Sequence, residues 1–143
     1  MNALTRLAVA VAFCLAALPT RADVTAKWSS IAADAVRAAR ENPASADRSL
    51  AAVRDAMAAA RGSGNGNGNG HVSAADSERR DAAQSVAAFA VLEALYPEQR
   101  ENFEMELAIA FSRIPETAAK AEGAALGRRI AAETIRNGRE IRP

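Results

Sequence analysis

Alanine is the feature that most limits the folds open to this chain. It occupies 38 of the 143 positions, whereas phenylalanine, tyrosine and tryptophan together occupy six. Alanine favours helix more than any other residue, but its side chain buries little apolar area. The sequence therefore predicts abundant local helix around a thin hydrophobic core.

Apolar residues recur every three or four positions in five segments, which is the spacing of one helix face. The predicted helices cover residues 23–41, 45–61, 73–96, 98–113 and 116–136. No segment alternates apolar and polar residues for long enough to predict a strand. We expect an all-α fold of about five amphipathic helices, packed mostly antiparallel through short connections. The main positions expected to face the core are Val24, Trp28, Ile31, Ala35, Leu50, Val53, Met57, Val86, Phe89, Leu92, Tyr96, Phe103, Leu107, Phe111, Leu126 and Ile130.

Residues that cap or break helices set the predicted boundaries. Asn42-Pro43 is expected to end the first helix, because a residue before proline is disfavoured in the helical region. Ser73 provides an oxygen acceptor that can cap the third helix. Asn137-Gly138 is expected to close the fifth helix, since these residue types readily adopt the left-handed conformation found at helix ends.

The first 22 residues resemble a Sec-type signal peptide. Arg6 precedes an apolar run over residues 7–18, and the small residues Thr20 and Ala22 follow it. A bilayer span requires roughly 20 apolar residues, so the run is too short to cross. We expect cleavage after Ala22, which leaves residues 23–143 as one periplasmic or secreted domain with no stable membrane anchor. A buried or membrane-anchoring first helix is the alternative.

The charge of the mature chain argues against nucleic acid as a partner. Cleavage would remove Arg6, Arg21 and the only cysteine, Cys14, and leave 16 of the 18 basic residues with all 17 acidic ones, a net charge of −1. Such a chain lacks the basic stripe that nucleic acid requires. It also has no thiol for a disulfide or a metal ion.

The glycine- and asparagine-rich tract at residues 62–72 predicts a flexible loop, because it has little to bury and much backbone entropy to lose. It lacks the Lys-Ser/Thr pair of a phosphate-binding loop. His71, the only histidine, lies at the end of this tract. Acid–base catalysis needs an imidazole held in fixed geometry, so we expect His71 to be a solvated loop residue.

Four carboxylates, Glu98, Glu101, Glu104 and Glu106, surround Phe103. Such a cluster suggests metal binding or acid–base catalysis. A di-iron helical bundle would also need Glu-x-x-His pairs, and this segment contains no histidine. We expect them to form the solvated face of an amphipathic helix.

Two arginine pairs, Arg79-Arg80 and Arg128-Arg129, have the charge to meet a phosphate. Isolated pairs on outer helix faces are more often solvated, and we favour that interpretation. Gly123 and Gly127 lie four positions apart in the fifth helix. Small residues at this spacing allow close helix approach and predict a packing seam.

Several of these segments together have a recognisable pattern. Residues 28–32 read Trp-Ser-Ser-Ile-Ala, residues 42–44 form a proline turn, and residues 50–57 form an alanine-rich helix. Residues 87–97 end in an aromatic–proline pair, and residues 121–131 contain Gly-Ala-Ala-Leu-Gly-Arg-Arg-Ile-Ala. This pattern resembles the amino-terminal helical region of the vanadium-dependent haloperoxidases, within the phosphatidic-acid-phosphatase-like superfamily. The resemblance covers most of the mature chain and implies a helical scaffold.

The catalytic part of that family has no counterpart here. The family holds vanadate or phosphate with a lysine, an Arg-Pro pair, a Ser/Gly-His pair and an arginine with a histidine. Arg54 stands where the family often has histidine, and no lysine precedes Arg142-Pro143 at the expected spacing. Oxyanion chemistry needs converging cations and a held imidazole. We therefore expect no haloperoxidase or phosphatase activity, and predict no catalytic, cofactor-binding or metal-binding residue.

Two functions stay open. The first is an exported, non-catalytic relative of the haloperoxidase scaffold, either a truncated remnant or an interaction module. It would bind a protein partner or self-associate through an exposed apolar helix face. The second is a self-contained periplasmic bundle that closes around Trp28, Phe89, Phe103 and Phe111 and binds a small ligand or a protein.

Overall fold

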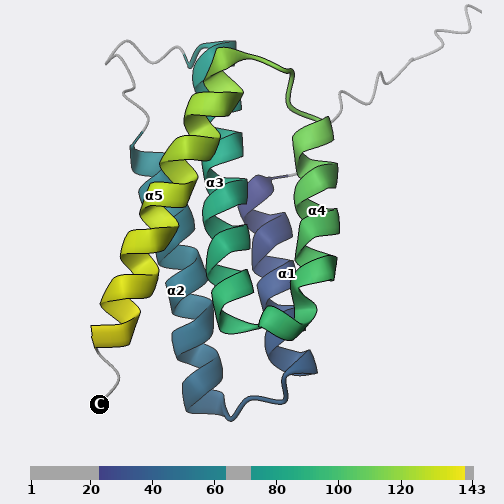
Figure 1. Ribbon diagram of the computed structural model, residues 1–143, viewed down its shortest axis with the longest axis vertical. Helices are drawn as coiled ribbons and strands as arrows, with labels where there is room; N and C mark the ends of the chain where they lie inside the picture. The colour runs from purple at the N-terminus through teal and green to yellow at the C-terminus, as the bar shows by residue number, and fades with distance from the viewer. Residues whose placement is uncertain (1–22, 64–71, 141–143) are drawn as a thin grey trace, which may run out of the picture.

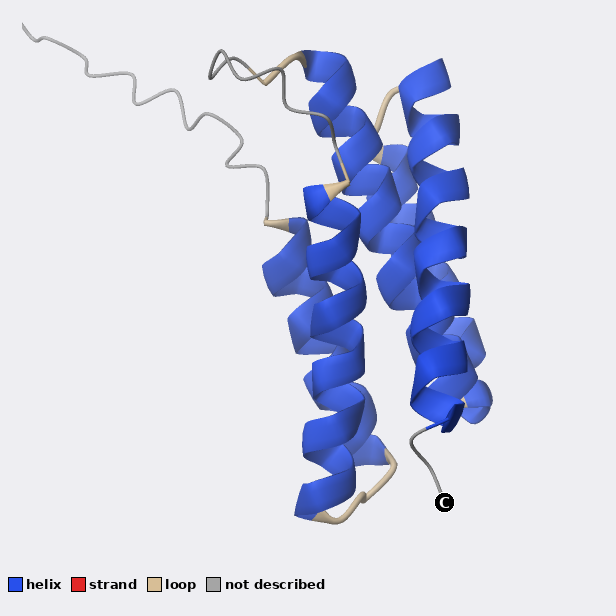
Figure 2. Ribbon diagram, turned by 90° about the vertical axis from the view of Figure 1, so that its left-hand side faces the viewer, coloured by secondary structure: helices blue, strands red, loops and turns tan. Residues whose placement is uncertain are grey.

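The computed structural model describes residues 23–63 and 72–140, and every regular element within them is helical. The elements are α1 (Val24–Ala38), α2 (Pro43–Gly62), α3 (Ala74–Leu95), the short 3-10 helix η1 (Pro97–Gln99), α4 (Arg100–Ser112) and α5 (Ala118–Glu140). Figures 1 and 2 show these helices side by side, with the connections at their ends. The all-α prediction is confirmed for this part of the chain. The expected signal peptide, most of the glycine-rich tract and His71 lie outside the described residues.

Helix α3 is the centre of the bundle and contacts each of the other four α-helices. Successive helices run in opposite directions along the bundle (Figure 1). Residues 82–88 of α3 are all buried, so this part of the helix has no solvent face. A helix surrounded by neighbours needs apolar or small side chains all round, and four alanines in this stretch meet that need.

The closest helix pair, α3 and α5, is parallel. Gly123 lies against Arg79, and Gly127, one turn further along α5, lies against Ala83, one turn further along α3. The two helices therefore run in the same direction. The prediction of mostly antiparallel packing concerned helices that follow one another in the chain, and α3 and α5 are separated by α4. The predicted packing seam at the two glycines is confirmed.

The core is thin, as the alanine content predicts. Its largest fully buried side chains are Trp28, Phe103, Met57, Leu92 and Val53. Buried alanines from α1, α2, α3 and α5 fill much of the remaining space. Within the described ranges, no helix is long and apolar enough to cross a membrane.

The turn between α1 and α2 differs from the prediction at both ends. Helix α1 ends at Ala38 because Arg40 takes a left-handed conformation, with φ of 51°. The N–H groups of Arg40 and Glu41 then bond back to carbonyls of the last helical turn. Helix α2 begins at Pro43 rather than at residue 45, since proline fits the first helical position and the Asn42 side chain caps the helix.

The predicted end of the fifth helix was wrong. Helix α5 continues through Asn137 and Gly138 to Glu140. Gly138 does not adopt the left-handed conformation that would close the helix. Glycine permits that conformation without requiring it, and an exposed glycine in a helix interior costs only about 1 kcal/mol.

Candidate functional site

A cavity of about 100 Å³ lies between α1, α3 and the carboxyl-terminal end of α4. Each helix contributes residues spaced three or four positions apart, so that their side chains lie on one helix face. The lining residues are Val24, Lys27 and Trp28 from α1, Asp81 and Ser85 from α3, and Glu106, Ile109, Ala110, Arg113 and Ile114 from α4 and the turn after it. The walls thus combine apolar side chains with a small set of polar ones.

Ser85 is the most deeply buried polar residue of the cavity lining. The residue has no exposed surface, and its Oγ has no hydrogen-bond partner among the described residues. A serine hydroxyl can donate one hydrogen bond and accept two. Leaving a buried polar group unpaired costs about 1–3 kcal/mol, so such a group usually has a structural or functional explanation. The neighbouring Gln84, by contrast, accepts a 2.7 Å hydrogen bond from the Thr25 hydroxyl.

An ion pair joins α1 to α4 beside the cavity. Lys27 Nζ lies 3.0 Å from Glu106 Oε2 and donates a 3.2 Å hydrogen bond to Oε1. The Oε2 atom is buried, and its contact with Lys27 lacks hydrogen-bond geometry. Glu106 was predicted to lie on the solvated face of its helix. That prediction was wrong, because the residue faces α1 and its side chain is only 29% exposed.

The other predicted carboxylates lie away from the cavity. Glu98, Glu101 and Glu104 are exposed, as expected for a solvated face. Glu104 accepts a 2.6 Å hydrogen bond from Arg100, and this bond, together with the charge of Glu93, raises the pKa of Arg100. In the ranges that the structure describes, no three His, Cys, Asp or Glu residues come together in a way that could hold a metal ion.

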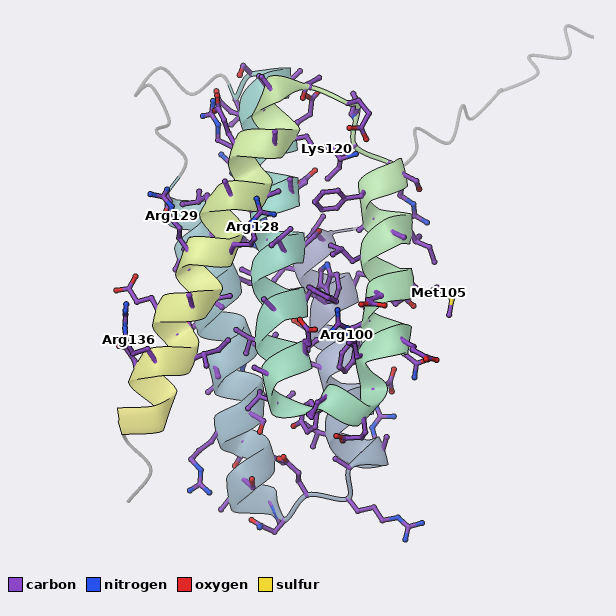
Figure 3. The ribbon with its side chains drawn as sticks, in the orientation of Figure 1. Arg100, Met105, Lys120, Arg128, Arg129 and Arg136 are labelled. Carbon is purple, nitrogen blue, oxygen red and sulfur yellow. The ribbon has the colours of Figure 1, made fainter. Side chains whose placement is uncertain are left out.

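The two arginine pairs have different surroundings. Arg128 and Arg129 are exposed on α5, as expected (Figure 3). Arg79 is instead part of the bundle, since its Nε lies 3.1 Å from Glu122 Oε2 and links α3 to α5. Arg80 is half-buried, and its Nε is shielded from solvent. The solvated interpretation was therefore wrong for the first pair.

The four aromatic residues expected at the centre of a closed bundle divide into two groups. Trp28 and Phe103 are almost completely buried, whereas Phe89 and Phe111 are half-buried. Trp28 touches both the core and the cavity. Because it is the only tryptophan, its fluorescence reports on this one place.

Sequence reasoning missed Ser85 and Asp81 as lining residues. The available signal was the Gln84-Ser85 pair within an alanine-rich segment, where two polar residues interrupt a stretch that is otherwise suited to burial. The pattern along α3 does not reveal which of its neighbours leaves space open beside Ser85. That depends on how α1 and α4 pack against it.

Comparisons of the chain with family models, curated proteins and solved structures found no match. The cavity's own chemistry is therefore the basis on which a function can be proposed.

Proposed function

We propose that this chain is an exported, non-enzymatic helical bundle that binds a small organic molecule in the cavity beside Trp28. The observation that carries the proposal is the cavity lining, in which apolar side chains of α1 and α4 lie beside the fully buried residue Ser85, whose hydroxyl has no hydrogen-bond partner among the described residues. Small-molecule sites combine apolar walls with a few polar groups that fix the ligand's orientation. Val24, Trp28 and Ile109 provide such walls here.

The lining favours binding over catalysis. A serine nucleophile needs a general base within hydrogen-bond reach, and the Ser85 Oγ has no such partner among the described residues. Lys27 and Glu106, which both line the cavity, form an ion pair and neutralise each other's charge. The arrangement is therefore suited to holding a molecule rather than to transforming it.

The cavity's size limits the ligand and its affinity. A closed apolar cavity of about 150 Å³ holds benzene, with its six heavy atoms. This cavity is partly open to solvent, so its volume of about 100 Å³ describes the part of a ligand that lies inside, by proportion a group of about four heavy atoms. At about 1.5 kcal/mol per heavy atom for the best small ligands, that enclosed part alone supports a dissociation constant in the range of tens of micromolar.

Titration of Trp28 fluorescence with molecules of this size tests the proposal. A ligand is expected to give a saturable change and to raise the melting temperature over the same concentration range. Ser85→Leu and Ala110→Leu, which fill the cavity from α3 and α4, are expected to abolish the response. Ser30→Leu, on the exposed side of α1, is the control and is expected to keep it. A response that survives both cavity-filling changes would place the ligand elsewhere and overturn the proposal.

A second candidate is the interaction scaffold that the haloperoxidase resemblance implies, with self-association through α4. Met105 and Ile109 are 59% and 41% exposed, and they lie four positions apart on one side of this helix. Figure 3 shows Met105 pointing away from the bundle. Light scattering across a concentration series tests this candidate, and Met105→Glu is expected to weaken any dimer. A monomer at all concentrations would exclude self-association.

A further inference from the structure

We infer that copies of this chain associate head to tail, with α4 of one copy packed on α5 of the next. The inference rests on the second function proposed above, self-association through α4, and names the surface that α4 binds. It depends on two exposed helix faces with complementary chemistry. One is the apolar and acidic face of α4, and the other is the basic face of α5.

The α4 face consists of Glu101, Met105 and Ile109, which follow one another at four-residue spacing along one side of the helix. Met105 and Ile109 are two of the three large apolar side chains that are exposed within the described residues. Glu101 is exposed and forms no ion pair with a described residue. Exposed apolar side chains beside a free carboxylate favour a partner surface that is positively charged.

The α5 face has that charge. Arg128, Ala132 and Arg136 are exposed at the same four-residue spacing, and neither arginine forms an ion pair with a described residue. Arg129 adds a positive charge beside them and Glu133 a negative one, so the face keeps a net positive charge. The short side chain of Ala132 leaves room between the two arginines that flank it.

The spacing of the two faces allows them to fit together. Met105 of one copy can lie over Ala132 of the next, covered on both sides by the aliphatic stems of Arg128 and Arg136. Four residues span about 6 Å along a helix, so Glu101 lies as far from Met105 as each arginine lies from Ala132. Contact at Met105 therefore brings Glu101 beside one of the two guanidinium groups.

The two faces lie on different sides of the molecule, so one chain cannot join its own pair. Helices α4 and α5 lie on opposite sides of α3 (Figure 1), and Met105 and Arg136 lie at opposite edges of the bundle (Figure 3). A contact between unlike faces leaves one face free on each end copy, so it can repeat. A single helix pair is smaller than the roughly 1,200 Å² of a stable interface, so we expect weak association at high protein concentration.

Sedimentation velocity of the full chain over a concentration series tests the inference. The mean mass is expected to rise past that of a dimer, and added salt is expected to weaken the association severalfold. Met105→Lys and the double variant Arg128→Glu/Arg136→Glu are each expected to weaken it by about tenfold or more, because each sets like charges against one another. Arg48→Glu, at an exposed position of α2, is the control and is expected to have no effect.

A mixture of the two variants is the decisive measurement. It is expected to associate again, because the intact α4 of the arginine variant meets the intact α5 of Met105→Lys. Ala132→Gln keeps every charge and fills the space between the arginines, so it is expected to weaken association even if the charge variants do not fold.

Three results would overturn the inference. A mixture that stays monomeric excludes the contact between α4 and α5. A dimer that persists in the arginine variant assigns the contact to α4 of both copies, and leaves self-association through α4 standing. A wild-type chain that is monomeric throughout the series overturns both. None of these results affects ligand binding beside Trp28, since no substituted residue lines the cavity.

Discussion

In the contact between α3 and α5, Gly127 lies directly against the main chain of Ala83: a Cβ added to Gly127 would come within 2.5 Å of the Ala83 carbonyl oxygen. Gly123 has the same relationship to Arg79, at 2.2 Å. A backbone oxygen inside a helix cannot turn aside as a flexible side chain can. Helix α5 therefore keeps its position only while both residues are glycine.

Gly127→Ala is expected to lower the free energy of unfolding by about 3 kcal/mol, since the added methyl group overpacks the α3–α5 contact. Gly138→Ala is the matched control, because a Cβ there meets nothing within 4 Å. It is expected to raise the free energy of unfolding by about 0.5–1 kcal/mol through helix propensity. Urea denaturation followed by circular dichroism measures both. Stabilisation by both substitutions would contradict the close approach.

Arg40→Gly is expected to stabilise the fold by about 1 kcal/mol. Arg40 has a φ of 51°, a left-handed conformation that favours glycine. Arg48→Gly removes the same side chain from an exposed position inside α2 and is expected to destabilise by about 1 kcal/mol. The melting temperature is expected to rise in Arg40→Gly and to fall in Arg48→Gly. An equal fall in both variants would show that contacts of the Arg40 side chain stabilise the fold by more than its left-handed backbone conformation costs.

Lys120 stabilises the turn between α4 and α5. The residue is 6% exposed, and its Nζ donates hydrogen bonds of 2.9 Å and 3.2 Å to the carbonyls of Phe111 and Ile114. It also pairs with Glu116 and lies 4.9 Å from the centre of the Phe111 ring. Figure 3 shows it at the start of α5, beside the end of α4.

Lys120→Met is expected to lower the free energy of unfolding by about 2–3 kcal/mol, because two carbonyls lose a charged donor. Glu116→Gln removes the ion pair alone. The Glu116 side chain is 89% exposed, so its loss is expected to cost less than about 1 kcal/mol. A loss in Glu116→Gln as large as that in Lys120→Met would assign the stabilisation to the ion pair instead.

Tyr96 is expected to make the fold sensitive to alkaline pH. Burial raises the pKa of Tyr96 above its ordinary value of 10.0, and the Glu41 carboxylate adds to the rise. Above about pH 10 the unfolded chain releases a proton that the folded chain still holds, so stability falls as pH rises toward the folded pKa. Below pH 10 this contribution is fully present.

Tyr96→Phe is expected to remove this part of the alkaline loss of stability. Since Tyr96 is the only tyrosine, the absorbance of tyrosinate reports its titration directly. An ordinary pKa in the folded chain, or an unchanged pH profile in Tyr96→Phe, would contradict the expectation.

The helices were predictable because their signals are local. Apolar spacing and the Ser73 cap depend only on near neighbours, and the structure confirms that cap, which accepts a hydrogen bond from the Asp76 N–H. The helix ends at Arg40 and Gly138 were missed because each residue type permits more than one backbone conformation. Packing and the adjoining turn decide between these conformations, and neither is visible in a short sequence window.

The cavity was less predictable because it depends on three helices at once. Glu106 was expected in solvent from the pattern of α4 alone, yet α1 packs beside it and supplies Lys27. The sequence around Ser85 does not indicate that its hydroxyl would lack a hydrogen-bond partner. That depends on which side chains of α1 and α4 pack against this part of α3.

The parallel seam has a consequence for the order of assembly. The strip of α3 that receives Gly123 and Gly127 is covered by a helix that follows α4 along the chain. Hairpins between neighbouring helices form from contacts close in sequence, whereas this seam requires the chain to cross the bundle first. Until α5 packs against it, this alanine-rich side of α3 is exposed to water, so we expect the core around α3 to close only when α5 binds.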